Sequence, residues 1–330
     1  MKTRRIGPFT VSSLGLGCMN LSHAYGTPPP RDAAVALLHS ALDAGITLFD
    51  TAALYGFGAN EELVGEVLAP HRKRIVLASK CGMQGINGQR VIDGRPETLR
   101  ASCEASLKRL RTEVIDLLYL HRVDAEVPVE DSVGAMADLV RAGKIRAIGL
   151  SEVSAVTLRR AYEVHPIAAL QTEYSLWTRN PEIAVLQSCR ELGVAFVAFS
   201  PLARGFLGGR LTEVESLEAK DIRRVMPRFS AENFPANLSL LRGFKAVASC
   251  IGCAPATLAL AWLLHQDEIV IPIPGTTKIE HLNELLQAPE WVLNAETLDE
   301  LDRLINHRTV SGARYNVATQ REIDTEEFQL

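Results

Sequence analysis

The stretch FDTAALYG, residues 49–56, reads as the end of a buried β-strand that runs into Asp50 and, five residues later, reaches Tyr55. An aspartate at a strand end often caps a short helix, and a tyrosine often packs with its hydroxyl at the surface. A chemical role for this acid and phenol would need partners from neighbouring strands. The rest of the chain therefore decides how the stretch is interpreted.

Further short apolar runs resemble this strand, and amphipathic segments lie between them. The expected strands are 14–17, 47–50, 75–80, 115–120, 147–151, 168–173, 195–200 and 269–273. The expected helices include 31–44, 61–68, 96–110, 129–142, 181–192 and 295–306. This alternation predicts a parallel sheet covered by helices. Eight such units favour a closed (β/α)8 barrel, the TIM barrel, over an open doubly wound sheet.

Two segments depart from the repeat. Residues 4–12, with Gly7 and Pro8 at their centre, predict a β-hairpin that closes the barrel floor. Residues 201–236 contain several prolines, glycines and charges without clear periodicity, so they predict a long loop after the seventh strand. No domain boundary is visible, and we expect residues 1–330 to form one domain.

Composition limits the partners. The chain is 47% hydrophobic with a net charge of -4, which predicts a packed domain without a nucleic-acid or membrane partner. The N-terminus lacks a continuous apolar segment, so we expect a cytoplasmic protein with a small-molecule substrate.

Six cysteines, at positions 18, 81, 103, 189, 250 and 253, are typical of reduced thiols. The close pair Cys250 and Cys253 lacks a second ligand pair, and we expect no metal site.

In a (β/α)8 barrel the loops after the strands build the active site. Three successive strands have a candidate site residue at their ends: the first ends at Asp50 with Tyr55 just after it, the second ends at Lys80, and the third ends at His121. Each residue alone has a structural explanation, but their convergence at successive strand ends favours a site. A lysine beside Tyr55 would lower its pKa from about 10 by stabilising the phenolate, and Asp50 would keep that lysine charged. Such a group can protonate an oxygen on which charge develops, which is half of a carbonyl reduction.

The motifs FDTAALYG, LASKCG and LLYLHRVD resemble the Asp, Tyr, Lys and His tetrad motifs of the aldo-keto reductases. Four further motifs follow in the family's order, so that the resemblance covers nearly the whole chain: IGLSEVS, AALQTEYSLW, AFSPLARGFLGG and PIPGTTKIEHL. The residues of these motifs resemble the bacterial and fungal branch of the family. The resemblance implies an NADPH-dependent oxidoreductase without a Gly-rich Rossmann fingerprint. It also implies that Tyr55 is the general acid, that Lys80 and Asp50 tune it, and that His121 orients the carbonyl.

The resemblance further implies a run of cofactor contacts. Ser151 and Gln171 would bind the nicotinamide carboxamide, with Glu152 where many relatives have asparagine, and Phe199 would stack on the ring. Contacts to the pyrophosphate and the ribose side are expected from Ser200, Pro201, Leu202, Arg204 and Gly205, and from Gly17, Cys18, Met19 and Asp50.

The last motif would surround the adenosine 2′-phosphate. Its expected contacts are Gly275, Thr276, Thr277, Lys278, His281 and Glu284. His281 stands where many relatives have arginine, and Leu285 where they have asparagine. The resemblance therefore favours NADPH with weaker discrimination against NADH.

Three functions fit these residues: reduction of aldehydes or ketones, oxidation of alcohols or sugars by the same tetrad, and an NADP-binding regulatory subunit with little turnover. The pocket lining is expected from residues 20–25, 82–94, 201–236 and Trp177, whose few charges favour neutral carbonyl compounds over acids. The sequence leaves open whether the protein is a monomer or a homo-oligomer, and whether the tail, residues 315–330, packs on a neighbour or stays mobile.

Overall fold

The computed structural model describes residues 1–22, 24–86 and 89–329 and contains an eight-stranded parallel sheet. Its strands, in spatial order, are β3 (Leu16–Gly17), β4 (Leu48–Asp50), β5 (Val76–Cys81), β8 (Ile115–Leu120), β9 (Ile145–Ser151), β10 (Ile167–Glu173), β11 (Ala195–Phe199) and β12 (Val270–Pro272). The sheet closes because Gly15 N donates to Pro272 O and Gly17 N donates to Pro274 O, each at 3.0 Å. The predicted (β/α)8 barrel is confirmed.

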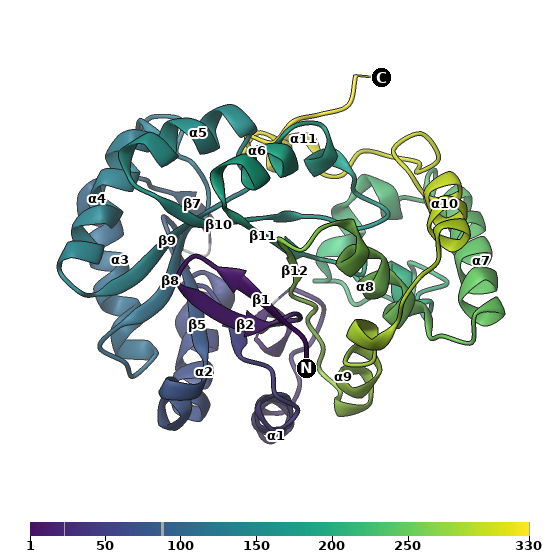
Figure 1. Ribbon diagram of the computed structural model, residues 1–330, viewed down its shortest axis with the longest axis horizontal. Helices are drawn as coiled ribbons and strands as arrows, with labels where there is room; N and C mark the ends of the chain where they lie inside the picture. The colour runs from purple at the N-terminus through teal and green to yellow at the C-terminus, as the bar shows by residue number, and fades with distance from the viewer. Residues whose placement is uncertain (23, 87–88, 330) are drawn as a thin grey trace.

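Helices surround the barrel and cover the outer face of its strands (Figure 1). The helices of the described chain are α1 (Arg31–Asp43), α2 (Ala59–Leu68), α3 (Pro96–Arg109), α4 (Val129–Arg141), α5 (Ala155–Val164), α6 (Val185–Leu192), α7 (Phe234–Cys250), α8 (Pro255–Gln266), α9 (Ile279–Leu285), α10 (Ala295–Leu304), which packs on α7, and α11 (Val317–Gln320) in the tail. α6 begins later than predicted because Asn180–Glu182 forms a separate 3-10 turn. α7 begins at Phe234, inside the segment predicted as a loop.

Two hairpins flank the barrel ends. The predicted one, β1 (Thr3–Ile6) with β2 (Phe9–Ser12), crosses the N-terminal end of the barrel (Figure 1). Its Ile6 and Val11 are fully buried among the inward-facing residues of the strands and so close the floor. The second hairpin, β6 (Met83–Ile86) with β7 (Gln89–Ile92), lies within the segment 82–94 that the sequence analysis treated as a loop.

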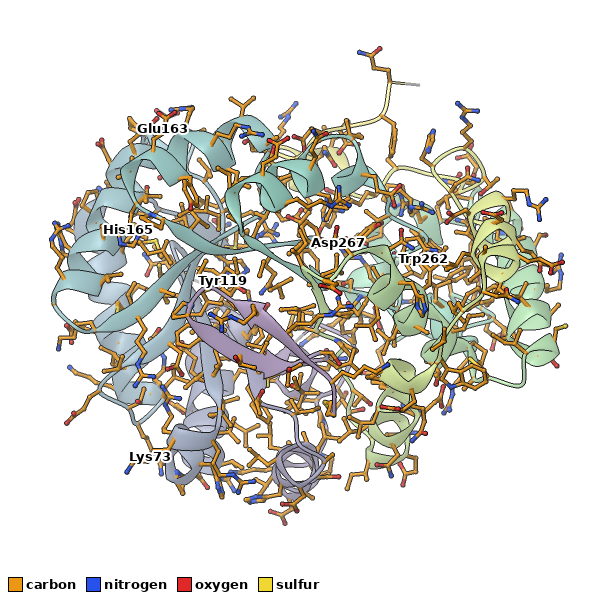
Figure 2. The ribbon with its side chains drawn as sticks, in the orientation of Figure 1. Lys73, Tyr119, Glu163, His165, Trp262 and Asp267 are labelled. Atoms are coloured by element: carbon orange, nitrogen blue, oxygen red, sulfur yellow. The ribbon has the colours of Figure 1, made fainter. Side chains whose placement is uncertain are left out.

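The barrel interior is filled by side chains, and Tyr119 of β8 is the largest of them to be fully buried there. Figure 2 shows Tyr119 among the strands, whereas Lys73 and Glu163 lie at the periphery. Gly149 of β9 makes room for this ring, because a Cβ there would lie 2.3 Å from Tyr119 Cδ1. The interior is therefore a packed core below the strand ends.

The C-terminal tail contacts its own barrel. Asp324 pairs with Val153 in a short β-bridge, and its carboxylate accepts a hydrogen bond from Thr157 Oγ1 at 2.6 Å. Glu326 accepts from Ala155 N at 2.7 Å at the start of α5. These contacts fix the tail across the C-terminal side of β9.

No described helix is long and apolar enough to cross a bilayer alone, and α7 with α8 meets that criterion only as a pair bent by 86°. The cysteines are free, and Cys250 is the last residue of α7 with Cys253 in the turn that follows.

Replacing Gly65 with alanine should destabilise the fold by about 1–3 kcal/mol, because its Cβ would lie 2.4 Å from the carbonyl oxygen of Arg109 at the end of α3. Gly134 of α4 provides the matched control, since a Cβ there meets nothing within 4 Å. Alanine at Gly134 should be neutral or stabilising by up to about 1 kcal/mol through helix propensity. Urea unfolding of both variants measures the difference, and equal stabilities would contradict the close approach of α2 to α3.

Candidate active site

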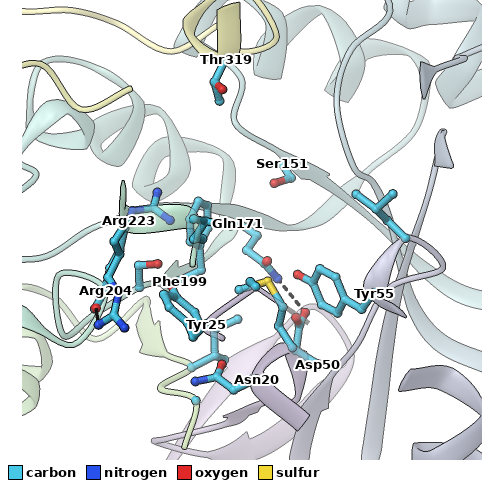
Figure 3. A pocket seen from close by; sticks show the side chains of 18 of the residues that line it. Asn20, Tyr25, Asp50, Tyr55, Ser151, Gln171, Phe199, Arg204, Arg223 and Thr319 are labelled. Carbon is cyan, nitrogen blue, oxygen red and sulfur yellow. Dashed lines mark hydrogen bonds between the residues drawn. The ribbon is translucent and has the colours of Figure 1, made fainter. Parts of the chain in front are cut away.

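A cavity of about 520 Å³ opens at the C-terminal ends of the barrel strands. Its walls come from residues that follow the strands, from segments 200–205 and 222–226 of the long loop, and from Tyr315, Asn316 and Thr319 of the tail. Figure 3 shows Tyr55 on one side and Arg204 with Arg223 on the opposite side. The cavity is thus built where the barrel topology predicts an active site.

Lys80 is the centre of the first cluster in this cavity. Its Nζ contacts the Asp50 carboxylate and donates to Thr51 O at 2.9 Å and to Tyr55 Oη at 3.1 Å. Gln171 Nε2 donates to the other oxygen of Asp50 at 2.7 Å. Lys80 is only 1% exposed and Asp50 3% exposed, so the ion pair is almost fully removed from water.

The electrostatics of this cluster differ in one respect from the sequence-based expectation. Burial raises the pKa of Tyr55 above its usual value, and Lys80 only partly opposes this. Burial alone would lower the pKa of Lys80, but Asp50 and Tyr55 more than offset it, so the pKa is raised. Lys80 therefore acts on the Tyr55 pKa in the expected direction, but burial outweighs it, and the expected net lowering of this pKa is wrong. Tyr55 is protonated at neutral pH, beside a lysine that stays charged.

His121 completes the group of four side chains. Its ring lies edge-on to Tyr55, with ring centroids 6.0 Å apart and an interplanar angle of 83°. Burial, followed by the fields of Arg122 and Lys80, lowers the pKa of His121 well below its usual value. The imidazole is consequently neutral at pH 7, able to donate one hydrogen bond into the cavity without carrying charge.

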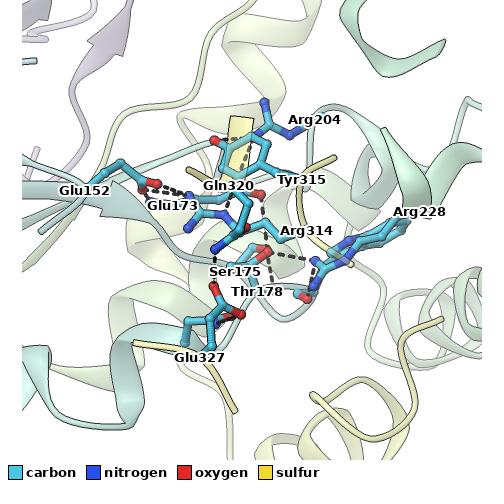
Figure 4. A network of polar contacts seen from close by, with 12 residues as sticks. Glu152, Glu173, Ser175, Thr178, Arg204, Arg228, Arg314, Tyr315, Gln320 and Glu327 are labelled. Carbon is cyan, nitrogen blue, oxygen red and sulfur yellow. Dashed lines mark hydrogen bonds and ion pairs between the residues drawn. The ribbon is translucent and has the colours of Figure 1, made fainter. Parts of the chain in front are cut away.

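A second cluster of buried charges lies beside the cavity (Figure 4). Arg314 Nη2 donates to both oxygens of Glu152 at 2.6 Å, and its Nε donates to Glu173 at 3.0 Å. Arg204 Nη2 donates to Glu173 at 2.5 Å and to Tyr315 Oη at 2.9 Å. Burial would raise the pKa of Glu173, but Arg204 and Arg314 reverse this and lower it to about 2. The tail is thereby tied to the ends of β9 and β10.

Most of the expected cofactor contacts line the cavity. They are Gly17, Met19, Asp50, Ser151, Gln171, Phe199, Ser200, Pro201, Leu202, Arg204, Gly205 and Gly275. Cys18 does not line it, because its side chain is buried in the core beneath β3. Glu152 does not line it either, since its carboxylate is turned to Arg314. Trp177, expected to line the pocket, packs instead against Phe206 and Phe229.

The expected 2′-phosphate residues other than Gly275 lie outside this cavity, in and just before α9, where Lys278 is exposed and Thr276 is buried. Thr276 Oγ1 accepts from Lys278 N at 3.2 Å, so this hydroxyl holds the turn before the helix. Arg210, from the long loop, contacts His281 and pairs with Glu284 at 3.0 Å. A guanidinium from another segment therefore stands beside the histidine that replaces the arginine of many relatives.

Backbone strain gathers around the cavity. Glu152, Ser200, Ala203 and Arg204 have left-handed φ angles of 57°, 48°, 50° and 57°. Non-glycine residues rarely adopt this region, and such strain persists where surrounding contacts over-determine the conformation. The chain turns sharply after β9 and β11 in this way, and Arg204 reaches Glu173 as a result.

Sequence reasoning missed several cavity residues. Arg90 and Arg223 lie in the loops expected to line the pocket, but Arg122 and Tyr315 also line the cavity, and Arg314 supports its wall. Arg122 belongs to the quoted HRVD motif, and its position directly after His121 was a sequence signal that could have predicted its place in the cavity. Arg314 lies 141 residues from Glu173 in β10, and Tyr315 lies 111 residues from Arg204, so no local pattern reveals them.

Comparisons with known proteins agree on one family. A profile of the Aldo/keto reductase family matches residues 13–306. A probable aldo-keto reductase 1 from Glycine max is 44% identical over 310 residues, which cover 93% of this chain and 89% of that protein.

Solved structures agree with this result. A glycerol dehydrogenase from Gluconobacter oxydans superimposes with a TM-score of 0.84 at 31% identity, covering 92% of this chain and 94% of that one. The holo form of an aldo-keto reductase from Bacillus halodurans superimposes with a TM-score of 0.77 at 26% identity, covering 93% and 97%.

Replacing Arg314 with methionine should destabilise the protein by about 3–5 kcal/mol at pH 7, because it leaves Glu152 buried without its counter-charge. The double variant Glu152→Gln/Arg314→Met should recover part of this loss, since the unpaired charge is gone. Urea unfolding of all three proteins measures both effects. A single variant as stable as the wild type would contradict the role of this ion pair.

The Glu173 carboxylate should also make stability depend on pH. Its folded pKa of about 2 lies below its ordinary value, so its contribution is complete above the unfolded pKa and is lost as pH falls towards 2. Unfolding free energies measured from pH 6 down to about pH 2 should fall less steeply for Glu173→Gln than for the wild type. Parallel pH curves would exclude Glu173 as the titrating group.

Proposed function

The chain belongs to the aldo/keto reductase family, and from that premise we propose that it reduces aldehydes or ketones to alcohols with NADPH, using Tyr55 as the general acid. Membership itself assigns an oxidoreductase that acts on carbonyl and alcohol groups. The observation that carries the finer proposal is the buried contact of Lys80 with both Asp50 and Tyr55.

The cavity suits a dinucleotide phosphate. Its volume of about 520 Å³ lies within the range usual for cofactor sites. The charged residues that line it are Arg90, Arg122, Arg204, Arg223 and Asp50, a set that favours an anionic ligand. Phe199 offers an aromatic ring on one wall, and Ser151 and Gln171 offer polar groups near Tyr55 (Figure 3). When bound there, the nicotinamide would supply the hydride.

The protein's own part is to hold and move one proton. Tyr55 is protonated at neutral pH and can give its hydroxyl proton to the substrate oxygen as negative charge develops on it. Lys80, held by Asp50 and Thr51 O, then stabilises the phenolate that remains. His121 is neutral and can donate a hydrogen bond that orients the carbonyl without competing for the proton.

Selectivity for the 2′-phosphate would come from the surface around α9. Lys278 is exposed there, and Arg210 adds a guanidinium beside His281. The pair of Arg210 with Glu284 is solvent-exposed, with 64% of the arginine side chain accessible, and such pairs are weak. Arg210 can therefore exchange Glu284 for a phosphate oxygen at small cost.

Oxidation of alcohols is the second candidate, favoured by the similarity to a glycerol dehydrogenase from Gluconobacter oxydans. The same residues serve that direction, with the Tyr55 phenolate accepting the proton. Assays of NADPH consumption with a carbonyl panel and of NADP reduction with an alcohol panel separate the two. A protein that binds NADPH but turns over neither panel would point to a regulatory subunit.

Tyr55→Phe should lower carbonyl reduction at least about a hundredfold, because the proton donor is removed while the ring remains. NADPH binding, followed by fluorescence titration, should change little. Tyr162→Phe on α5 removes a hydroxyl away from the cavity and serves as the control. Retained turnover in Tyr55→Phe would overturn the assignment of the general acid.

Lys278→Met should raise the KM for NADPH about tenfold or more while leaving the KM for NADH nearly unchanged, since only NADPH carries the 2′-phosphate. Arg210→Met should act in the same direction. Steady-state kinetics with both cofactors and one aldehyde provide the measurement. Equal losses with NADPH and NADH would place these residues in structural support rather than in phosphate recognition.

A further inference from the structure

Arginines dominate the charged lining of the cavity, and most of them are already neutralised. Their carboxylate partners, with N–O distances, are Glu322 for Arg90 (2.5 Å), Glu173 for Arg204 (2.5 Å) and Asp221 for Arg223 (2.6 Å). Arg122 also lines the cavity, but within residues 1–22, 24–86 and 89–329 no carboxylate forms an ion pair with it. The acid of the cavity wall, Asp50, is committed to Lys80 and Gln171.

The hydrogen bonds of Arg122 occupy one side of its guanidinium. Nη1 donates to His121 O at 2.6 Å and to Ser151 Oγ at 3.2 Å. Nε is buried without a hydrogen-bond acceptor in the described part of the chain, and no bond from Nη2 is formed there either. The two bonds from Nη1 hold the group in place, and the edge formed by Nε and Nη2 has no acceptor among the described residues, with Nε itself buried.

That edge has the geometry of a carboxylate site. Parallel N–H groups of a guanidinium bind the two oxygens of one carboxylate in a bidentate, charge-assisted pair. A buried N–H without an acceptor is unfavourable, and a ligand carboxylate at this edge would satisfy both the hydrogen bond and the charge. A neutral carbonyl compound would satisfy neither.

Arg122 lies at the reacting end of the cavity. It follows His121 directly after β8, and its charge acts on both the Tyr55 hydroxyl and the His121 ring. Ser151, which it contacts, is the last residue of the neighbouring strand β9. Arg204 and Arg223 lie across the cavity from Tyr55 (Figure 3), and the proposed pyrophosphate contacts are on that far side. Arg122 is therefore placed to meet the substrate rather than the cofactor phosphates.

We propose that Arg122 anchors a carboxylate of the substrate, so that this protein prefers oxo acids, aldehydes or ketones that carry a carboxylate, over neutral carbonyl compounds. The inference rests on the proposed carbonyl reduction and adds its substrate class. It replaces the expectation of neutral substrates, which was drawn from loops in which Arg122 was not included.

Matched aldehyde pairs test this substrate class directly. The ortho, meta and para carboxybenzaldehydes, each compared with its methyl ester, vary the distance between carbonyl and carboxylate while keeping the reacting group. We expect at least one acid to exceed its ester in kcat/KM by about tenfold or more. Benzoate should compete with that acid substrate, and benzamide should not.

Variants of Arg122 then assign the preference to this side chain. Arg122→Met should reduce the acid-to-ester ratio of kcat/KM by about tenfold to a hundredfold, mostly through KM of the acid. Arg122→Lys keeps the charge without the fork and should retain part of the preference. Arg141→Met on the exposed surface of α4 makes the same change in net charge away from the cavity and should leave the ratio unchanged.

The outcomes are distinguishable. If no aldehyde of either kind is reduced, the proposed function itself fails. If esters and acids are reduced equally well, or if Arg122→Met leaves the ratio unchanged, the carboxylate anchor is wrong although the reductase stands. If Arg122→Met weakens NADPH binding in a fluorescence titration and slows acid and ester equally, Arg122 serves the cofactor side and the proposal is overturned. Should Arg122→Met fail to fold, the benzoate and benzamide comparison on the wild type decides.

Discussion

The charged lysine at the mouth of the barrel is the constraint on which the site depends. Lys80 is buried to 1% exposure, and an ammonium group in that position is unfavourable unless charge and hydrogen bonds compensate it. Asp50 supplies the opposite charge, and Thr51 O and Tyr55 Oη supply the hydrogen-bond acceptors for the ammonium group. The parallel pairing of β4 with β5 brings these residues together, because it aligns Asp50 with Ala78 two residues before Lys80. Moving either Lys80 or Asp50 would leave a buried charge unpaired.

The second buried cluster holds the wall of the cavity together through ion pairs, as the ion pair of Lys80 holds the residues beside Tyr55. Arg314 joins Glu152 after β9 to Glu173 at the end of β10, and Arg204 joins Glu173 to Tyr315. Segments that are far apart in sequence therefore meet through charge rather than through apolar packing. The cluster has three guanidinium groups, counting the neighbouring Arg228, against two carboxylates, and burial lowers the pKa of Arg228 to about 9. An anionic ligand beside Arg204 would fit this excess of positive charge.

The fold was predictable where local pattern and tertiary environment agree. The strands that carry Asp50, Lys80 and the residue before His121 were located to within a residue at their C-terminal ends, because continuous apolar runs between helices have few alternatives. α8 was missed, since Ala256 to Leu263 are all buried and such a helix shows no amphipathic period. The β6–β7 hairpin was missed because its strands are four residues long and their apolar residues, Met83 and Ile86 in β6 and Val91 and Ile92 in β7, do not alternate with polar ones.

The sequence by itself determined the barrel and placed Asp50, Tyr55, Lys80 and His121 at or just beyond the ends of successive strands, because the period of the strands and the residues at their ends are local properties. Only the tertiary structure decided that Glu152 turns away to Arg314, that Arg210 stands beside His281, and that Arg122 lines the cavity without a carboxylate partner among the described residues. It also decided the sign of the Tyr55 pKa shift, since desolvation depends on what surrounds the hydroxyl and outweighs the lysine beside it. Charge pairing and burial are set by residues distant in the chain, and no pattern within one segment encodes them.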